Sequence, residues 1–142
     1  MFSTWYKFRV LQQDGKLKII DFGAMRCYDP KKNYDTTCLG TRGYAAPEQF
    51  GGLGQTDSRA DIYALGALMH YMLTGLNPQQ PPYASQPIRA INPKLPANLE
   101  AIIIKCMQPA RENRYQTVES LLKALNGEPE KKGLFARLLG KR

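Results

Sequence analysis

The sequence has few of the residues that build metal sites and disulfides. It carries three cysteines, Cys27, Cys38 and Cys106, an odd number with no pair at a metal-ligand spacing, and a single histidine, His70. This usage is typical of a reducing compartment, so we expect a cytoplasmic protein with unreactive thiols. Because His70 falls among apolar residues in the middle of a predicted helix, a packing role is favoured over catalysis for it.

Long hydrophobic runs are also lacking. The longest candidate, Ile62–Leu73, has about a dozen residues, whereas a membrane-spanning helix needs about 20. The first segment, Met1–Arg9, mixes aromatic and basic residues and has no apolar stretch of the kind that a signal peptide requires. With 142 residues, 43% of them hydrophobic and 23% charged, the chain has the composition of one ordinary globular domain.

The net charge of +8 is spread thinly along the chain. The basic residues are adjacent only at Lys31-Lys32, Lys131-Lys132 and Lys141-Arg142, and no basic helix face with interleaved aromatic residues is present. A nucleic-acid-binding surface would concentrate this charge. We therefore expect no nucleic-acid partner.

A β-hairpin is predicted near the start. Two short apolar segments, Val10–Leu11 and Leu17–Ile20, flank Asp14-Gly15, and Asp-Gly favours a tight turn because both turn positions need positive φ. The polar stretch 26–43 then predicts a long loop, a feature that in compact domains is usually functional.

Helices are predicted over the rest of the chain. The first begins at Asp57 or Ser58 and ends at Thr74 before Gly75; it is apolar on nearly every side, which indicates a buried central helix. Its large apolar side chains recur at helical spacing: Ile62, Leu65, Leu68, Met69, Met72 and Leu73.

Two further helices are expected at Asn98–Gln108 and Thr117–Asn126, the latter ended by Gly127, and the proline-rich stretch Asn77–Pro96 is expected to be irregular. Their predicted inward side chains are Leu99, Ile102, Ile103, Cys106 and Met107 in the first, and Val118, Leu121, Leu122 and Leu125 in the second. The fold class is therefore mainly α with a small β-hairpin.

The expected organisation has three parts. Residues 1–9 form an atypical N-terminal segment, residues 10–126 the domain, and residues 127–142 a basic amphipathic tail. The tail places Leu134, Phe135, Leu138 and Leu139 at helical spacing among basic residues. It could contact a partner or an anionic membrane, with a poorly ordered terminus as the simpler alternative.

Four segments carry a resemblance to a known family. Asp21-Phe22-Gly23 follows the second strand, the run from Gly40 to Glu48 reads GTRGYAAPE, Asp61 opens the run DIYALG, and Arg114 lies further along. In this order and spacing, they resemble the large lobe of bacterial eukaryotic-like (Hanks-type) Ser/Thr protein kinases. The resemblance extends from about Leu11 to Leu125 and implies a protein-kinase-like C-terminal lobe.

The resemblance implies ATP and Mg²⁺ as cofactors. Asp21 would be a Mg²⁺ ligand, and Asp21, Phe22 and Gly23 would border the nucleotide pocket. The alternative is that Asp21 only caps the turn after the strand. Whether this chain binds the nucleotide stays open.

The same resemblance makes residues 40–44 a substrate-docking loop. Its members are Gly40, Thr41, Arg42, Gly43 and Tyr44, and the implied substrate is a protein that accepts phosphate on Ser or Thr. Candidate phosphorylation sites are Thr36, Thr37 and Thr41, against the alternative of an ordinary polar loop. The family assigns structural roles to Glu48 and Arg114, which would pair, and to Asp61, which would accept backbone N–H groups of the catalytic loop.

The residues that would perform catalysis have no match. Nothing resembles the Gly-rich phosphate loop, the strand lysine of the small lobe, or the HRD catalytic loop; counting back from Asp21 puts Ser3, Trp5 and Phe8 at the catalytic Asp, Lys and Asn. We therefore predict a partial Ser/Thr kinase domain with no intact catalytic residue and no activity by itself. The alternatives are a non-catalytic, pseudokinase-like binding module and one half of a kinase completed by a partner segment.

Overall fold

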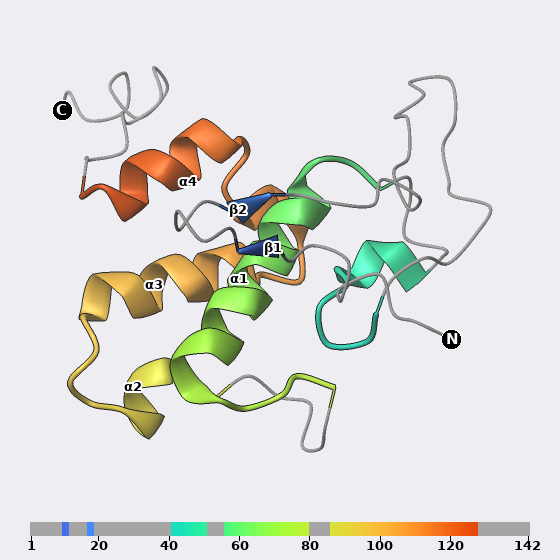
Figure 1. Ribbon diagram of the computed structural model, residues 1–142. Helices are drawn as coiled ribbons and strands as arrows, with labels where there is room; N and C mark the ends of the chain where they lie inside the picture. Colours follow the sequence, from blue (N-terminus) through green and yellow to red (C-terminus); the bar gives the residue numbers. More distant parts are fainter. Residues whose placement is uncertain (1–9, 12–16, 19–40, 51–55, 80–85, 128–142) are drawn as a thin grey trace, which may run out of the picture.

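A computed structural model describes residues 10–11, 17–18, 41–50, 56–79 and 86–127 (Figure 1). Strands β1 (Val10–Leu11) and β2 (Leu17–Lys18) pair antiparallel, with Leu11 opposite Leu17. The other elements are helical, in the order η2 (Pro47–Phe50), α1 (Arg59–Thr74), α2 (Ile88–Ile91), α3 (Ala97–Cys106), η3 (Arg111–Asn113) and α4 (Val118–Leu125). This confirms the predicted class, mainly α with one small hairpin.

The ends of α1 follow from local chemistry. At the start, Asp57 Oδ1 accepts the backbone N–H of Arg59 at 2.9 Å, which satisfies one of the free donors of the first turn. At the end, Gly75 adopts φ 71° and its N–H donates to the Tyr71 carbonyl at 2.8 Å. Both predicted ends of the central helix are confirmed.

Helix α1 is not buried on nearly every side, as predicted, but has one buried side. Small residues dominate it, while Leu65 is 41% exposed and Met72 is 74% exposed. The reason lies at Gly66, where an added Cβ would come within 2.6 Å of Cys106 Cβ in α3. Because α3 approaches α1 this closely, the contact favours small side chains. The buried residues are Ala60, Ile62, Ala64, Gly66, Ala67 and His70.

Helix α3 packs against α1, and α4 lies beside α3 (Figure 1). As predicted, α3 buries Ile102, Ile103 and Cys106. Burial raises the pKa of the Cys106 thiol to about 12, which keeps it protonated and unreactive. The core cluster that joins the three helices consists of Ile62, Ile102, Cys106, Tyr115 and Leu121.

Helix α4 begins with a capping box, in which Thr117 and Ser120 exchange side-chain to backbone hydrogen bonds, and Gly127 follows it at φ 76°. Its predicted limits are thus correct to within a residue. Its predicted inward face is wrong for three of the four residues, because only Leu121 reaches the core. Val118, Leu122 and Leu125 lie on the side of α4 that α3 leaves uncovered.

The proline-rich connection contains one short helix that the sequence analysis did not predict. Pro87 precedes α2, Ile88 is buried, and the Arg89 N–H donates to Glu100 Oε2 of α3 at 2.8 Å. Just before it, the Gln86 carbonyl accepts a hydrogen bond from Nε2 of the buried His70 at 2.7 Å, which agrees with a packing role for this histidine.

Among the described helices, none is long and apolar enough to cross a membrane.

Candidate functional site

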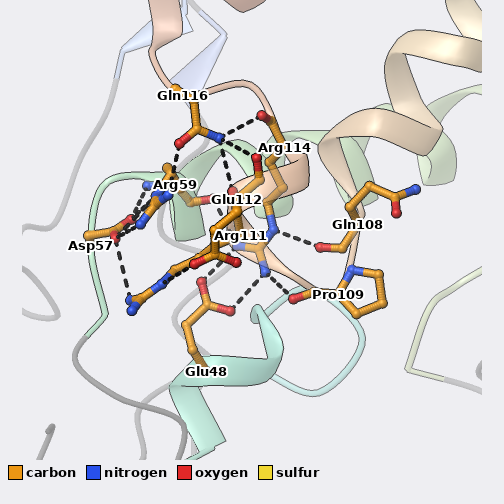
Figure 2. Close-up of polar contacts among 9 residues, drawn as sticks. All are labelled: Glu48, Asp57, Arg59, Gln108, Pro109, Arg111, Glu112, Arg114 and Gln116. Atoms are coloured by element: carbon orange, nitrogen blue, oxygen red, sulfur yellow. Dashed lines mark hydrogen bonds and ion pairs between the residues drawn. The ribbon is translucent and has the colours of Figure 1, made fainter.

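The structure brings Glu48 and Arg114 together in a buried ion pair (Figure 2). Arg114 Nη1 donates to Glu48 Oε1 at 2.7 Å, and Nη2 donates to Oε2 at 2.8 Å. The arginine is 2% exposed and the glutamate 4%. A planar guanidinium matches a carboxylate in this two-pronged geometry, and burial strengthens the attraction while making the loss of either partner costly.

Arg114 uses every one of its N–H donors. Besides the two bonds to Glu48, Nε donates to the Gln108 carbonyl at 2.7 Å, Nη1 to the Arg59 carbonyl at 3.1 Å and Nη2 to the Pro109 carbonyl at 2.9 Å. Its guanidinium also lies 5.0 Å from the ring centre of Tyr63. One side chain therefore joins η2, the first turn of α1 and the end of α3.

A second, more exposed polar layer surrounds this pair (Figure 2). Arg59 donates to both oxygens of Asp57 and, through Nη1, to Gln116 Oε1 at 2.8 Å, while Arg111 Nη1 lies 3.4 Å from Asp57. The side-chain hydrogen bond from Arg59 lowers the pKa of Asp57 below its ordinary value. The amide of Gln116 also donates to the carbonyl of Arg114 at 2.8 Å, so the two layers are connected.

Residues 41–45, which include most of the loop predicted to dock a substrate, are held by their own backbone and by the segment after α1. The N–H groups of Tyr44 and Ala45 both donate to the Thr41 carbonyl, at 3.0 and 2.9 Å, and Tyr44 is buried. Gly43 adopts φ 87°, and an added Cβ would lie 2.2 Å from the Pro78 carbonyl oxygen. Only glycine meets both conditions. The loop therefore has one defined shape, with Arg42 exposed on it.

Asp61 stands apart from this network. It lies in the first turn of α1 and is exposed, and within the described part of the chain its carboxylate has no hydrogen bond and no ion pair. Desolvation by the surrounding protein nevertheless raises the pKa of this carboxyl. With Leu65 and Met72, at helical spacing on the same side, Asp61 forms the uncovered face of α1.

The remaining predicted site residues lie outside the described residues: Asp21, Phe22, Gly23, Thr36, Thr37 and Gly40. In the ranges that the structure does describe, no three His, Cys, Asp or Glu side chains gather in a way that could hold a metal.

The sequence analysis missed the outer layer around Asp57, Arg59, Arg111 and Gln116. The residues are common surface types, and Asp57 was considered only as a helix cap. One local feature of the sequence could have indicated this layer. Asp57 and Arg59 lie two residues apart at the start of α1, where a carboxylate and a guanidinium can meet beside the first turn. The link to Gln116, 57 residues further on, has no signal in the sequence.

Comparisons with known proteins agree with these motifs. The family model described as "Protein kinase domain" matches residues 10–136. Serine/threonine-protein kinase A of Synechocystis is 34% identical over 124 residues, which cover 78% of this chain and 23% of that protein. Serine/threonine-protein kinase PknB of Mycobacterium tuberculosis is 32% identical over 135 residues, covering 80% and 21%.

A third relative carries a different name. Tyrosine-protein kinase MasK of Myxococcus xanthus is 35% identical over 127 residues, which cover 81% of this chain and 20% of that protein. The chain thus spans between a fifth and a quarter of the length of these relatives. The similar proteins thus include kinases named for serine/threonine and one named for tyrosine.

Proposed function

Because this chain belongs to the protein kinase family, we propose that it forms the large-lobe platform of a bacterial Ser/Thr kinase domain and transfers no phosphate by itself. The uncovered face of α1 is the observation that carries this proposal. Among the described residues, this central helix leaves Leu65 and Met72 exposed and gives Asp61 no hydrogen bond or ion pair. The described part of the platform is thus held together around Glu48 and Arg114 and leaves one face of α1 exposed.

The chemistry of phosphoryl transfer explains the expected inactivity. The reaction depends on positioned charge: Mg²⁺, where it is bound, neutralises the phosphates, and a catalytic aspartate accepts the hydroxyl proton. These 142 residues offer Asp21 as one match to a metal ligand and, at Ser3, a residue that cannot act as that base. Removing a single preorganised electrostatic group costs about 10²–10³ in rate, so the combined loss leaves no measurable transfer.

What the platform keeps is the means to present a protein substrate. The segment from Thr41 to Glu48 is fixed at one end by Gly43 against Pro78 and at the other by Arg114. Both of these fixing contacts are made within this chain. We assign Thr36, Thr37 and Thr41 as candidate phosphorylation sites of the same region, and a protein carrying Ser or Thr as the substrate class.

The direct test is transfer from labelled ATP and Mg²⁺ to casein and to the chain itself. We expect no incorporation above that of an Asp21→Asn control, and no thermal stabilisation of either protein by Mg²⁺-ATP. Incorporation or stabilisation that the wild-type chain shows and Asp21→Asn lacks would contradict the proposal. Adding the N-terminal part of the Synechocystis kinase domain as a separate chain tests completion by a partner segment: activity that requires both pieces would establish it.

The defined shape of the docking loop also favours a second candidate function, that of a non-catalytic module that binds peptides through residues 40–44. Binding of a peptide library would then survive Asp21→Asn but be lost in Gly43→Val, since valine resists positive φ and collides with Pro78. Gly75→Val is the matched control, because Gly75 also has positive φ but no atom within 4 Å of an added Cβ. Equal binding by both glycine variants would exclude the loop as the binding surface.

A further inference from the structure

The outer side of α4 carries an apolar stripe that no described element covers. Leu121 is 2% exposed and belongs to the core, whereas Val118, Leu122 and Leu125 are 44%, 53% and 40% exposed. The spacing of four and then three residues places these three side chains in one row along the helix. A row of this kind is the seam into which a second amphipathic helix packs.

We propose that this stripe is covered by the tail of the same chain, residues 134–142, folded back as a short helix antiparallel to α4. The connection between α4 and the tail allows this fold-back. Gly127 ends α4 with a left-handed backbone, φ 76°, and open space around it, so the chain can turn there. Residues 128–133 make a link of six residues, within the two to eight or so that join packed helices.

The spacing of the tail residues also matches that of the stripe on α4. Phe135 and Leu138 are three residues apart and Arg142 follows four residues later, the reverse of the spacing along the stripe on α4. In an antiparallel arrangement Phe135 therefore falls beside Leu125, Leu138 beside Leu122, and the alkyl stem of Arg142 beside Val118. Each row is about 10–12 Å long, at 1.5 Å of rise per residue.

Charge favours the same arrangement. In this register the guanidinium of Arg142 comes next to Glu119, the acidic residue in the first turn of α4. The flanking leucines, Leu134 and Leu139, widen the apolar face of the tail, and Gly133 and Gly140 bracket it. The pairing is specific, because a shift of one residue would turn Phe135 and Leu138 away from the row on α4.

Hydrogen exchange on the full 142-residue chain tests this pairing. We expect the amides of residues 134–139 to exchange at least about tenfold more slowly than in a free peptide of the same sequence. Leu122→Glu and Leu138→Lys should each return them to the peptide rate. The double variant should recover protection, because the new glutamate and lysine would face one another.

Leu65→Glu on the uncovered face of α1 is the control and should leave tail exchange unchanged. Helical content, measured by circular dichroism, checks that each variant still folds. Because Leu122 is exposed, we expect the Leu122→Glu variant to fold. Peptide-like exchange of the tail in the wild-type chain would overturn the proposal. So would protection that rises with protein concentration, which would indicate a second copy, or protection that appears only with anionic phosphatidylserine vesicles.

Discussion

Replacing Arg114 by methionine tests the buried ion pair most directly. The change keeps an unbranched apolar stem but removes the guanidinium, so Glu48 stays buried at 4% exposure without its partner. The carbonyl groups of Gln108, Pro109 and Arg59 lose a donor at the same time. Breaking a buried pair by removing one partner costs about 3–5 kcal/mol, a large share of the roughly 5–15 kcal/mol that stabilise a domain.

Arg111→Met is the matched control. It makes the same substitution three residues away, in η3, where the arginine side chain is 28% exposed and reaches Asp57 and Glu112 only at 3.4 and 3.3 Å. Ion pairs that are open to solvent and this long contribute about 0–1 kcal/mol, less than a buried two-pronged pair. Urea denaturation, followed by far-ultraviolet circular dichroism, should therefore show a loss several times larger for Arg114→Met than for Arg111→Met.

A double-mutant cycle with Glu48→Gln separates the pair from the carbonyl contacts. If the pair is the main source of stability, the double variant should lose clearly less than the sum of the two single losses, with a coupling energy of about 1–3 kcal/mol. Equal losses for the two arginine variants, or additive losses in the cycle, would refute the role given to Arg114.

Three other predictions concern the helix that this pair supports. In Asp57→Asn, stability should fall by up to about 1 kcal/mol at pH 7 relative to wild type. Since the pKa of Asp57 is lowered by folding, the difference should be present above the unfolded value near 3.9 and vanish as pH falls through the folded value, which pH-dependent urea melts can follow. In the same melts at pH 7, Asp61→Asn should change stability by no more than about 0.5 kcal/mol or be slightly stabilising. The raised pKa of Asp61 means that burial disfavours its charged form, and no hydrogen-bond donor among the described residues loses its partner. Marked destabilisation would reveal a partner of Asp61 outside the described residues. Gly66→Ala should cost about 1–3 kcal/mol by overpacking against Cys106, more than Gly75→Ala, which meets no neighbour and suffers only backbone strain.

The ends of the helices could be predicted from sequence because they are local. Asp57 and Gly75 limit α1, and Thr117 and Gly127 limit α4, through hydrogen bonds within a few residues of the chain. The buried face of α1 could not be predicted in this way. Which side of an apolar helix is covered depends on how closely its neighbour approaches, and that distance is set at Gly66 by a helix some 40 residues away.

The contacts of the candidate site also differ in how far the sequence could predict them. The pairing of Glu48 with Arg114, 66 residues apart, was expected only because the motifs resemble a family in which the pair occurs. No periodicity or composition connects the two positions. The outer layer from Asp57 to Gln116 was missed because neither residue type nor spacing marks a contact between surface residues.

The two fixed points of the docking segment have different physical origins, and this bears on what the chain can do. Gly43 is held by backbone shape and by its approach to Pro78, whereas Glu48 is held by charge and hydrogen bonds. Between them Ala45 and Ala46 are buried, so motion at one end is resisted by packing before it reaches the other. Loss of the ion pair should then loosen η2 while leaving the turn at Thr41–Tyr44 in place. If peptides bind this segment, Arg114→Met should weaken binding far less than Gly43→Val, even though it destabilises the fold more.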